Sequence, residues 1–274
     1  LIANSFKPMK EKYDWGTNPF YYLSGINRVH PTYVQEMMID SRYNEEDIIA
    51  VIERLGKEGG KKYSKNILVE ARNYYPEKPQ GNWSPVKLFK GKEVILIGSG
   101  PGASVHRKAI ELYIKDSKPL VVALNAQSAI DNDLIDVRIA CHPVRIMTDC
   151  ERLKQLSQPL ITPASILTSN VLDLMSSIEL LDYGLGIQGT KVVYKETHCI
   201  LSNPQAISYA LAVASSGKAK QLLLAGFDGY NADDPRRLEN DLILEKHQSV
   251  DSAVPILAVT PTLYHIESTS IYAL

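Results

Sequence analysis

The apolar residues of the chain follow two different patterns, one in its first quarter and another in the remainder. In residues 1 to 75 they recur at helical spacing, as in "HPTYVQEMMID" and "NEEDIIAVIERLGKEG". Residues 76 to 92, "PEKPQGNWSPVKLFKGK", hold three prolines, two glycines and no such period, as is typical of a linker. The chain is therefore predicted to begin with a small helical region, joined by that linker to a second domain over residues 93 to 274.

From residue 93 onward, short runs that are apolar throughout alternate with helical stretches such as "GASVHRKAIELYIKD" and "NPQAISYALAVASSG". The runs are "EVILIG", "PLVVALN", "VRIAC", "PLITP", "TKVVY", "QLLLAGFD" and "PILAVTP". Apolar runs separated by helices are typical of buried parallel strands. The predicted fold class is α/β: a Rossmann-like three-layer domain with a mostly parallel sheet, preceded by the small helical region.

Composition narrows the classes of partner. The chain has 30 basic and 31 acidic residues and a net charge of −1, which leaves no electrostatic footprint for nucleic acid. No window approaches the roughly 18 apolar residues that a membrane span needs. Three widely spaced cysteines fit neither a disulfide framework nor a zinc ribbon, so a cytoplasmic location is expected. The opening "LIANSF" has no initiator Met, which suggests a fragment of a longer polypeptide.

A turn rich in glycine follows the first predicted strand. Ligands of open parallel sheets bind beyond the carboxyl ends of the strands, where glycines let the backbone approach a phosphate and a helix N-terminus supplies N–H donors. The spacing "GSGPGAS" is neither a dinucleotide fingerprint nor a P-loop. The alternative is a turn that serves only strand-to-helix geometry. The predicted nucleotide-binding residues here are Gly98, Ser99, Gly100, Pro101, Gly102 and Ser104.

Polar residues also follow other predicted strands. Asn125 and Gln127 close the second strand with amides that suit a ribose or a base edge, although Asn125 equally suits a capping role. Ser202 and Asn203 are predicted to cap the helix that starts at Pro204. Asp228 follows a later strand, where its carboxylate could bind ribose hydroxyls or a metal, or simply form a turn. The predicted nucleotide-binding set therefore also includes Asn125, Gln127, Ser202, Asn203 and Asp228.

Candidate catalytic groups are fewer. His247 is the histidine to test as a general base, and Tyr183 and Tyr194 are possible hydroxyl donors to a phosphate. The chain lacks H-E-x-x-H, paired C-x-x-C and G-x-S-x-G signatures, so no metal site is predicted.

Residues 10 to 38, "KEKYDWGTNPFYYLSGINRVHPTYVQEMM", resemble the segment that follows the catalytic barrel in aldolases of the HMG-CoA lyase-like family, which includes 4-hydroxy-2-oxovalerate aldolase. In that family the barrel carries the metal and the catalytic residues, and this chain has no room for it. The resemblance implies an upstream aldolase barrel as a partner, and with it lyase activity outside this chain.

Residues 93 to 274 resemble a group of Rossmann-like proteins that includes bacterial CMP-sugar sialyltransferases, nonulosonic-acid transferases and a 6-hydroxymethylpterin pyrophosphokinase-like family. The resemblance rests on "GSGPGAS", "ALNAQ" and "LSNPQAISYALAVASSGKAKQLLLAGFDGY". It implies that Gly98 to Ser104 and Asn125 bind CMP or a CMP-sugar. The usual Gly-Pro-Ser is Gly-Pro-Gly here, the usual Ser-Gly is Ser202-Asn203, and the sialyltransferase base matches His247 only loosely.

The leading hypothesis is a domain that binds a nucleotide-sugar, with a CMP-sugar favoured, in a glycosyltransferase-like protein of bacterial surface-glycan synthesis. His247 would activate an acceptor hydroxyl while tyrosine hydroxyls, with Tyr194 as the candidate, stabilise the departing phosphate. The rival hypothesis is a non-catalytic module that binds a metabolite or the aldolase barrel, with residues 1 to 75 as the contact to the barrel and as a homodimer interface. A third hypothesis is pyrophosphoryl transfer from ATP. That reaction needs a metal site, for which Asp228 is the one candidate ligand.

Overall fold

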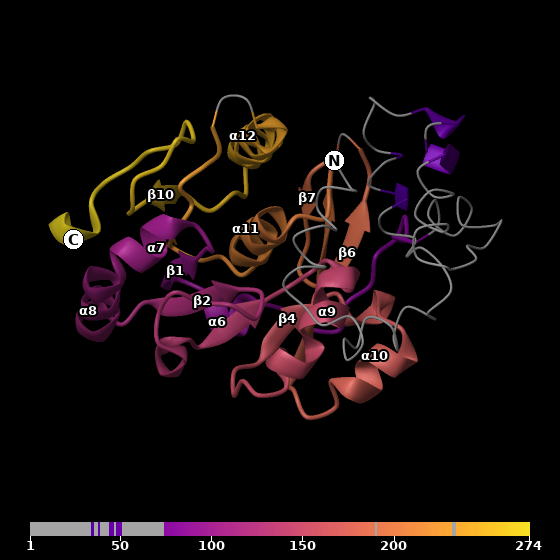
Figure 1. Ribbon diagram of the computed structural model, residues 1–274, viewed down its shortest axis with the longest axis horizontal. Coiled ribbons are helices and arrows are strands. Elements are labelled where there is room, and N and C mark those ends of the chain that lie inside the picture. Colours follow the sequence, from indigo (N-terminus) through magenta and orange to yellow (C-terminus); the bar gives the residue numbers. More distant parts are fainter. Residues whose placement is uncertain are drawn as a thin grey trace. The chain divides into compact units, whose positions relative to one another are not determined.

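The computed structural model describes residues 34–35, 38, 44–46, 48–50, 74–189, 191–231 and 234–274. The chain divides into two compact units, which are coloured along the sequence in Figure 1. One comprises residues 1–76, 142–155 and 166–177, and its helices include α9 (Pro143–Leu153) and α10 (Ser169–Leu174). The other comprises residues 77–141, 156–165 and 178–274 and contains the sheet. Most of residues 10 to 38, on which the aldolase resemblance rests, lie outside the described part.

The larger unit is built on a seven-stranded sheet whose neighbouring strands all pair in parallel. Its order is β10-β9-β1-β2-β3-β4-β5. The strands are β1 (Glu93–Ile97), β2 (Leu120–Leu124), β3 (Val137–Ile139), β4 (Leu160–Thr162), β5 (Leu180–Asp182), β9 (Gln221–Ala225) and β10 (Ile256–Ala258). The predicted α/β class with a parallel sheet is confirmed. From β1 the chain adds strands on one side up to β5 and later returns to add β9 and β10 on the other, so the topological switch point lies between β1 and β9.

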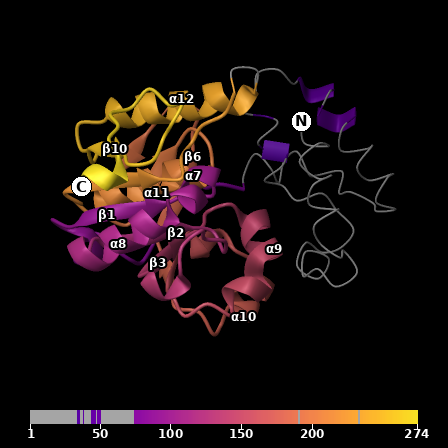
Figure 2. The ribbon, with the colours of Figure 1, turned by 60° about the vertical axis from the view of Figure 1, so that its left-hand side comes forward.

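Helices cover both faces of this sheet. Alternate residues of β1, Ile95 and Ile97, pack with Ile110 and Ile114 of α8 in one buried cluster. On the other face α11 is buried from Ile207 to Ser215 and packs against β2 and β3. Figure 2 shows α8 and α11 on opposite sides of β1. The helices of this unit are α6 (Val86–Phe89), α7 (Pro101–Val105), α8 (Arg107–Ser117), α11 (Ala206–Ser216) and α12 (Pro235–Gln248), with 3-10 turns η1 (Asn132–Leu134), η2 (Ala164–Ile166) and η3 (Ile271–Ala273).

A second, three-stranded sheet has the order β6-β8-β7 and consists of β6 (Gly184–Ile187), β7 (Val193–Tyr194) and β8 (His198–Leu201). β7 pairs with β8 in antiparallel orientation. The prediction that "TKVVY" is a buried parallel strand of the main sheet is therefore wrong. Both residues of β7 are only half-buried, which fits an edge strand rather than one covered on both faces.

Candidate functional site

The glycine turn lies at the switch point and is joined to the turn that follows β9. The Gly98 N–H donates to the Ala225 carbonyl at 2.8 Å, and the Gly100 N–H donates to the Gly226 carbonyl at 2.9 Å. The Gly102 N–H, in the first turn of α7, donates to Oδ1 of Asp228 at 2.8 Å. The N–H groups of all three glycines are thus bound within the protein itself.

The same contacts explain why glycine stands at these positions. A Cβ at Gly98 would lie 2.5 Å from the Gly226 carbonyl oxygen, and one at Gly102 would lie 2.5 Å from Oδ1 of Asp228. A Cβ at Gly100 would overlap the Asp228 carboxylate as well. In the described part of the chain, Oδ2 of Asp228 is buried without a hydrogen-bond partner. The inner side of the turn is therefore filled by the Asp228 carboxylate.

A ligand at this place can contact only the outer side of the turn. Of the predicted binding residues, those that are exposed there are Ser99, Pro101 and Ser104. Gln127, in the loop after β2, is half-buried. Their role in nucleotide binding stays a prediction.

Asn125 directly follows β2, and its backbone lies in the left-handed region, at φ 59°. Its N–H donates to the Ile139 carbonyl at 2.8 Å, and its own carbonyl accepts from Nη1 of Arg138 at 3.0 Å. Arg138 is 1% exposed, and its Nε and Nη2 donate to the side-chain oxygens of Gln158 at 3.1 Å and Asn132 at 2.6 Å. Arg138 thus holds the backbone of Asn125 in place. The sequence analysis missed it, although a charged residue inside the apolar run "VRIAC" is a usable signal.

Ser202 and Asn203 do not cap α11. The helix begins at Ala206, and Gln205 is its N-cap without a side-chain hydrogen bond, so the predicted cap and the predicted start at Pro204 are wrong. The chain is still extended at Gln205, with φ −81° and ψ 143°, which keeps the preceding residues out of the helix. Asn203 instead donates from Nδ2 to Glu239 of α12 at 3.1 Å.

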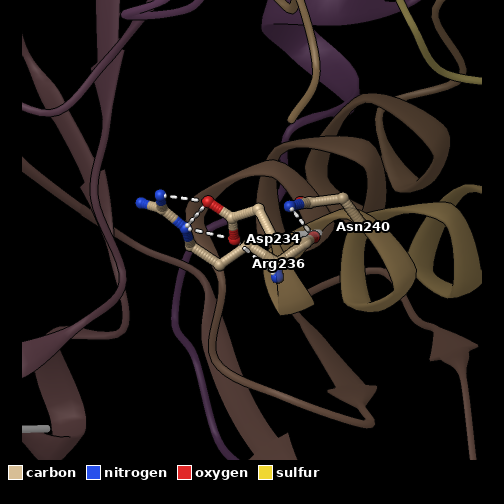
Figure 3. A network of polar contacts seen from close by, with 3 residues as sticks. All are labelled: Asp234, Arg236 and Asn240. Carbon is tan, nitrogen blue, oxygen red and sulfur yellow. Dashed lines mark hydrogen bonds and ion pairs between the residues drawn. The ribbon is translucent and has the colours of Figure 1, made fainter. Parts of the chain in front are cut away.

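A charged group lies beyond the end of β9, at the start of α12 (Figure 3). Asp234 caps α12, since its Oδ1 accepts the Arg236 N–H at 2.9 Å. The same carboxylate accepts from Nε of Arg236 at 2.9 Å and from Nη2 at 2.5 Å. The Arg236 guanidinium lies over the ring of Tyr230, 4.2 Å from its centroid. The hydrogen bond to Asp234 raises the pKa of Arg236, and that from Arg236 lowers the pKa of Asp234.

The loop after β10 joins this group to the Asp228 turn. The Leu263 N–H donates to the Asp228 carbonyl at 2.8 Å, and the Thr262 hydroxyl donates to the Phe227 carbonyl at 2.6 Å. Tyr264 is buried, which raises its pKa, and the nearby Tyr230 raises it further. The turns after β1, β9 and β10 therefore form one continuous polar region at the carboxyl edge of the sheet.

The two predicted catalytic residues contact each other. The Tyr194 hydroxyl of β7 lies 2.9 Å from Nδ1 of His247, and Nε2 of His247 lies 2.9 Å from the Val254 carbonyl. Because a carbonyl only accepts, Nε2 carries the proton and Nδ1 accepts from Tyr194. His247 is 1% exposed, and burial lowers its pKa, so its ring is neutral.

This pair lies far from the glycine turn. α12 starts beside the end of β9 and runs back toward the start of β10, over about 21 Å for 14 residues. His247, near the end of α12, bonds to Val254, two residues before β10 begins at Ile256. The Tyr194–His247 pair is therefore near the amino edge of the sheet, and the structure does not bring it together with Asp228.

Tyr194 also lines a small hollow of about 10 Å³, with room for about one water molecule, between the small sheet, α11 and α12. Ser202, Ser208 and Lys246 supply its other polar groups, and the remaining lining residues are Val192, Leu201, Leu211 and Ile243. Tyr183, by contrast, is fully buried. Its hydroxyl lies 2.9 Å from the carbonyls of Lys195 and His198, so it is engaged within the protein.

Within the described residues, no three His, Cys, Asp or Glu side chains gather as a metal site would require, and no helix is long and apolar enough to span a membrane. The cysteines Cys141, Cys150 and Cys199 are buried and form no disulfide.

Comparison with known proteins gives one informative match. No family model and no curated protein matches the chain. A solved structure, the MAf glycosyltransferase from Magnetospirillum magneticum AMB-1, superposes with a TM-score of 0.52 and 11% identity, over 90% of this chain and 48% of that protein. The chain thus spans about half the length of a protein whose Rossmann-like fold it shares. None of these comparisons supports the aldolase resemblance, which stays a prediction.

Proposed function

We propose that the unit containing the seven-stranded sheet is the donor-binding part of a nucleotide-sugar-dependent glycosyltransferase, with a CMP-sugar as the donor. The observation that carries the proposal is the continuous polar region at the switch point, formed by the turns after β1, β9 and β10, with the turn after β2 at the same edge of the sheet. Crevices at such switch points are where open α/β sheets bind nucleotides. The fold shared with the MAf glycosyltransferase supports the same class of reaction.

The side chains on the outer side of this region suit a nucleotide. Ser99 and Ser104 offer hydroxyls beside the glycine turn, and the Asn125 amide both donates and accepts, as a cytosine edge requires. Arg138 donates to the backbone carbonyl of Asn125. This contact fixes the position from which the Asn125 side chain leaves the backbone. The Asp228 carboxylate leaves the inner side of the turn closed, so the nucleotide lies across the outer surface.

The transfer reaction forms a bond between an acceptor oxygen and the anomeric carbon, breaks the bond to the donor phosphate and releases CMP. The acceptor proton must pass to a base. His247 has both ring nitrogens engaged within the protein, so of this pair only the Tyr194 hydroxyl can reach the hollow, which has room for a water molecule and not for an acceptor sugar. We therefore base the proposal on donor binding and test the contribution of the Tyr194–His247 pair separately.

The test is calorimetric titration of the protein with CMP, UMP and GMP, followed by an assay for CMP release from a CMP-sugar. We expect CMP to bind at least 10-fold more tightly than UMP or GMP, and Asn125→Ala to weaken that binding. The exposed Asn82, outside this region, provides the matched control Asn82→Ala. Absence of binding to all three nucleotides would overturn the proposal. CMP binding without any release from CMP-sugars would favour a non-catalytic binding module.

A further inference from the structure

We propose that Arg236 binds a negatively charged oxygen group of the donor, and that Asp234 holds its guanidinium in place until that group replaces the Asp234 carboxylate as the partner of the guanidinium. The proposal rests on the function proposed above, because it names the residue that recognises the charge of the donor. The group is an oxyanion, either the nucleotide phosphate or a carboxylate on the sugar.

The geometry of the existing ion pair shows what Arg236 is arranged to bind. Nε and Nη2 of its guanidinium donate side by side to the two oxygens of Asp234, at 2.9 Å and 2.5 Å. A phosphate or another carboxylate offers the same pair of acceptors. In the described part of the chain, Nη1 has no hydrogen-bond partner, and the Arg236 side chain is 56% exposed. The two donors Nε and Nη2, called the fork below, are thus already aligned for a pair of acceptor oxygens, and the side chain that carries them is accessible from solvent.

Two features allow the exchange without disturbing the fold. Oδ1 of Asp234 accepts both the Arg236 backbone N–H and Nε of its guanidinium, so the cap of α12 remains when the guanidinium turns to another partner. The Tyr230 ring supports the guanidinium from one face at 4.2 Å, which limits the orientations it can take. Because ion pairs this exposed are weak in water, an incoming oxyanion can compete with Asp234.

The position of Arg236 fits the donor site. Tyr230 follows Asp228 by two residues, and Asp228 is joined by hydrogen bonds to the turn after β1 and to the loop after β10. Since the chain carries a net charge of −1, an anionic donor must be recognised by a local cation. The neighbouring Arg237 is less exposed, at 27%, and its Nε lies 3.8 Å from Asp241, which makes it the matched control.

The experiment compares the affinities of cytidine, CMP and CMP-N-acetylneuraminate for the wild type, Arg236→Ala, Arg236→Lys and Arg237→Ala. We expect Arg236→Ala to weaken CMP binding by roughly 10-fold or more while cytidine binding is unchanged, because cytidine has no oxyanion. Arg236→Lys, which keeps the charge but loses the fork, should recover only part of the affinity. Arg237→Ala should bind like the wild type.

The outcomes separate the two sources of the oxyanion. A loss of CMP affinity identifies the phosphate, whereas unchanged CMP affinity with weaker binding of CMP-N-acetylneuraminate identifies the sugar carboxylate. Equal affinities of Arg236→Ala and the wild type for all probes would overturn the inference while the proposed function stands. If the wild type binds neither CMP nor the CMP-sugar, the proposed function fails, and this inference fails with it. Unfolding temperatures of the variants within about 2 °C of the wild type confirm that folding is intact.

Asp234→Asn gives an independent test. Asparagine is a good N-cap, so the helix start is preserved while the competing charge is removed. We expect its CMP or CMP-sugar affinity to rise by a few-fold. A fall in affinity would show that the Asp234 carboxylate assists ligand binding rather than competing with it. That result would overturn the proposed exchange of partners at Arg236.

Discussion

The carboxylate of Asp228 accepts a 2.8 Å hydrogen bond from the backbone N–H of Gly102, although 126 positions separate the two residues in sequence. This contact connects the turn after β1 to the turn after β9, at the point where the order of strands reverses. The glycines of the first turn are therefore needed for the approach of another part of the chain. We therefore expect substitutions of Gly102 and Asp228 to be energetically coupled.

We expect Gly102→Ala to destabilise the protein by about 1–3 kcal/mol, although alanine favours helices. The nearest atoms to a Cβ at this position all belong to Asp228, at 2.5, 3.1 and 3.2 Å. Urea denaturation of Gly102→Ala, Asp228→Ala and the double variant measures the effect. In the double variant the alanine no longer meets a carboxylate, so the two losses should not add.

The matched control is Gly189→Ala, because a Cβ there has no atom within 4 Å in the described structure. Its stability should stay within about 0.5 kcal/mol of the wild type. Strictly additive losses for Gly102→Ala and Asp228→Ala would show that the two turns are not in contact in solution.

Arg138→Met should lower the free energy of unfolding by about 2–3 kcal/mol. The substitution leaves the Asn125 carbonyl and the side-chain oxygens of Asn132 and Gln158 without the donors that they now have. Because the Asn125 backbone is then less well held, CMP affinity should fall too. Denaturation and calorimetry check the two effects, with the half-exposed Arg107, replaced by Met, as the control. An equally stable Arg138→Met would argue against the buried network.

The sheet was largely predictable from the sequence because both of its faces are buried. β1 and β2 are apolar at nearly every position, and six of the seven predicted runs are strands of the main sheet. "TKVVY" was misplaced because a short apolar run does not reveal which sheet it joins. β5, whose three residues are all half-buried, lacks the continuous apolar signal and was missed.

The site was predictable only in part. The rule that ligands bind at the carboxyl ends of parallel strands singled out the glycine turn, Asn125 and Asp228 separately. That Asp228 fills the glycine turn depends on a tertiary contact across the switch point, which local patterns do not contain. The same is true of Tyr194 and His247, which were chosen individually and meet through the packing of β7 against α12.

The buried His247 should make stability depend on pH. Burial lowers its pKa from 6.5 in the folded state, so the unfolded chain binds a proton first as the pH falls. The free energy of unfolding should therefore be constant above about pH 6.5 and decrease below it, until the pH passes the folded-state pKa. Urea titrations between pH 5 and 8 measure this slope.

His247→Gln should remove most of that slope. His198, whose pKa burial also lowers, contributes a share, so His198→Gln should reduce the slope without removing it. If the free energy of unfolding of His247→Gln depends on pH as steeply as that of the wild type, the buried His247 ring is not the source of the pH dependence.

A separate measurement concerns the chemical role of the Tyr194–His247 pair. Loss of transfer activity in Tyr194→Phe with unchanged stability would assign the pair such a role.

Asn125 combines a backbone role and a proposed ligand role, which substitution can separate. At φ 59° a glycine fits without strain, whereas the Cβ of an alanine lies too close to the following carbonyl oxygen, which costs about 1 kcal/mol. We therefore expect Asn125→Gly to be more stable than Asn125→Ala by about that amount in urea denaturation, while both lose CMP affinity, because both lack the amide. Lys218, at φ 57°, gives the control pair Lys218→Gly and Lys218→Ala, which should show the same stability difference with unchanged CMP affinity. Equal stability of the two Asn125 variants would refute the left-handed backbone, and wild-type CMP affinity in both would remove the amide from the donor site.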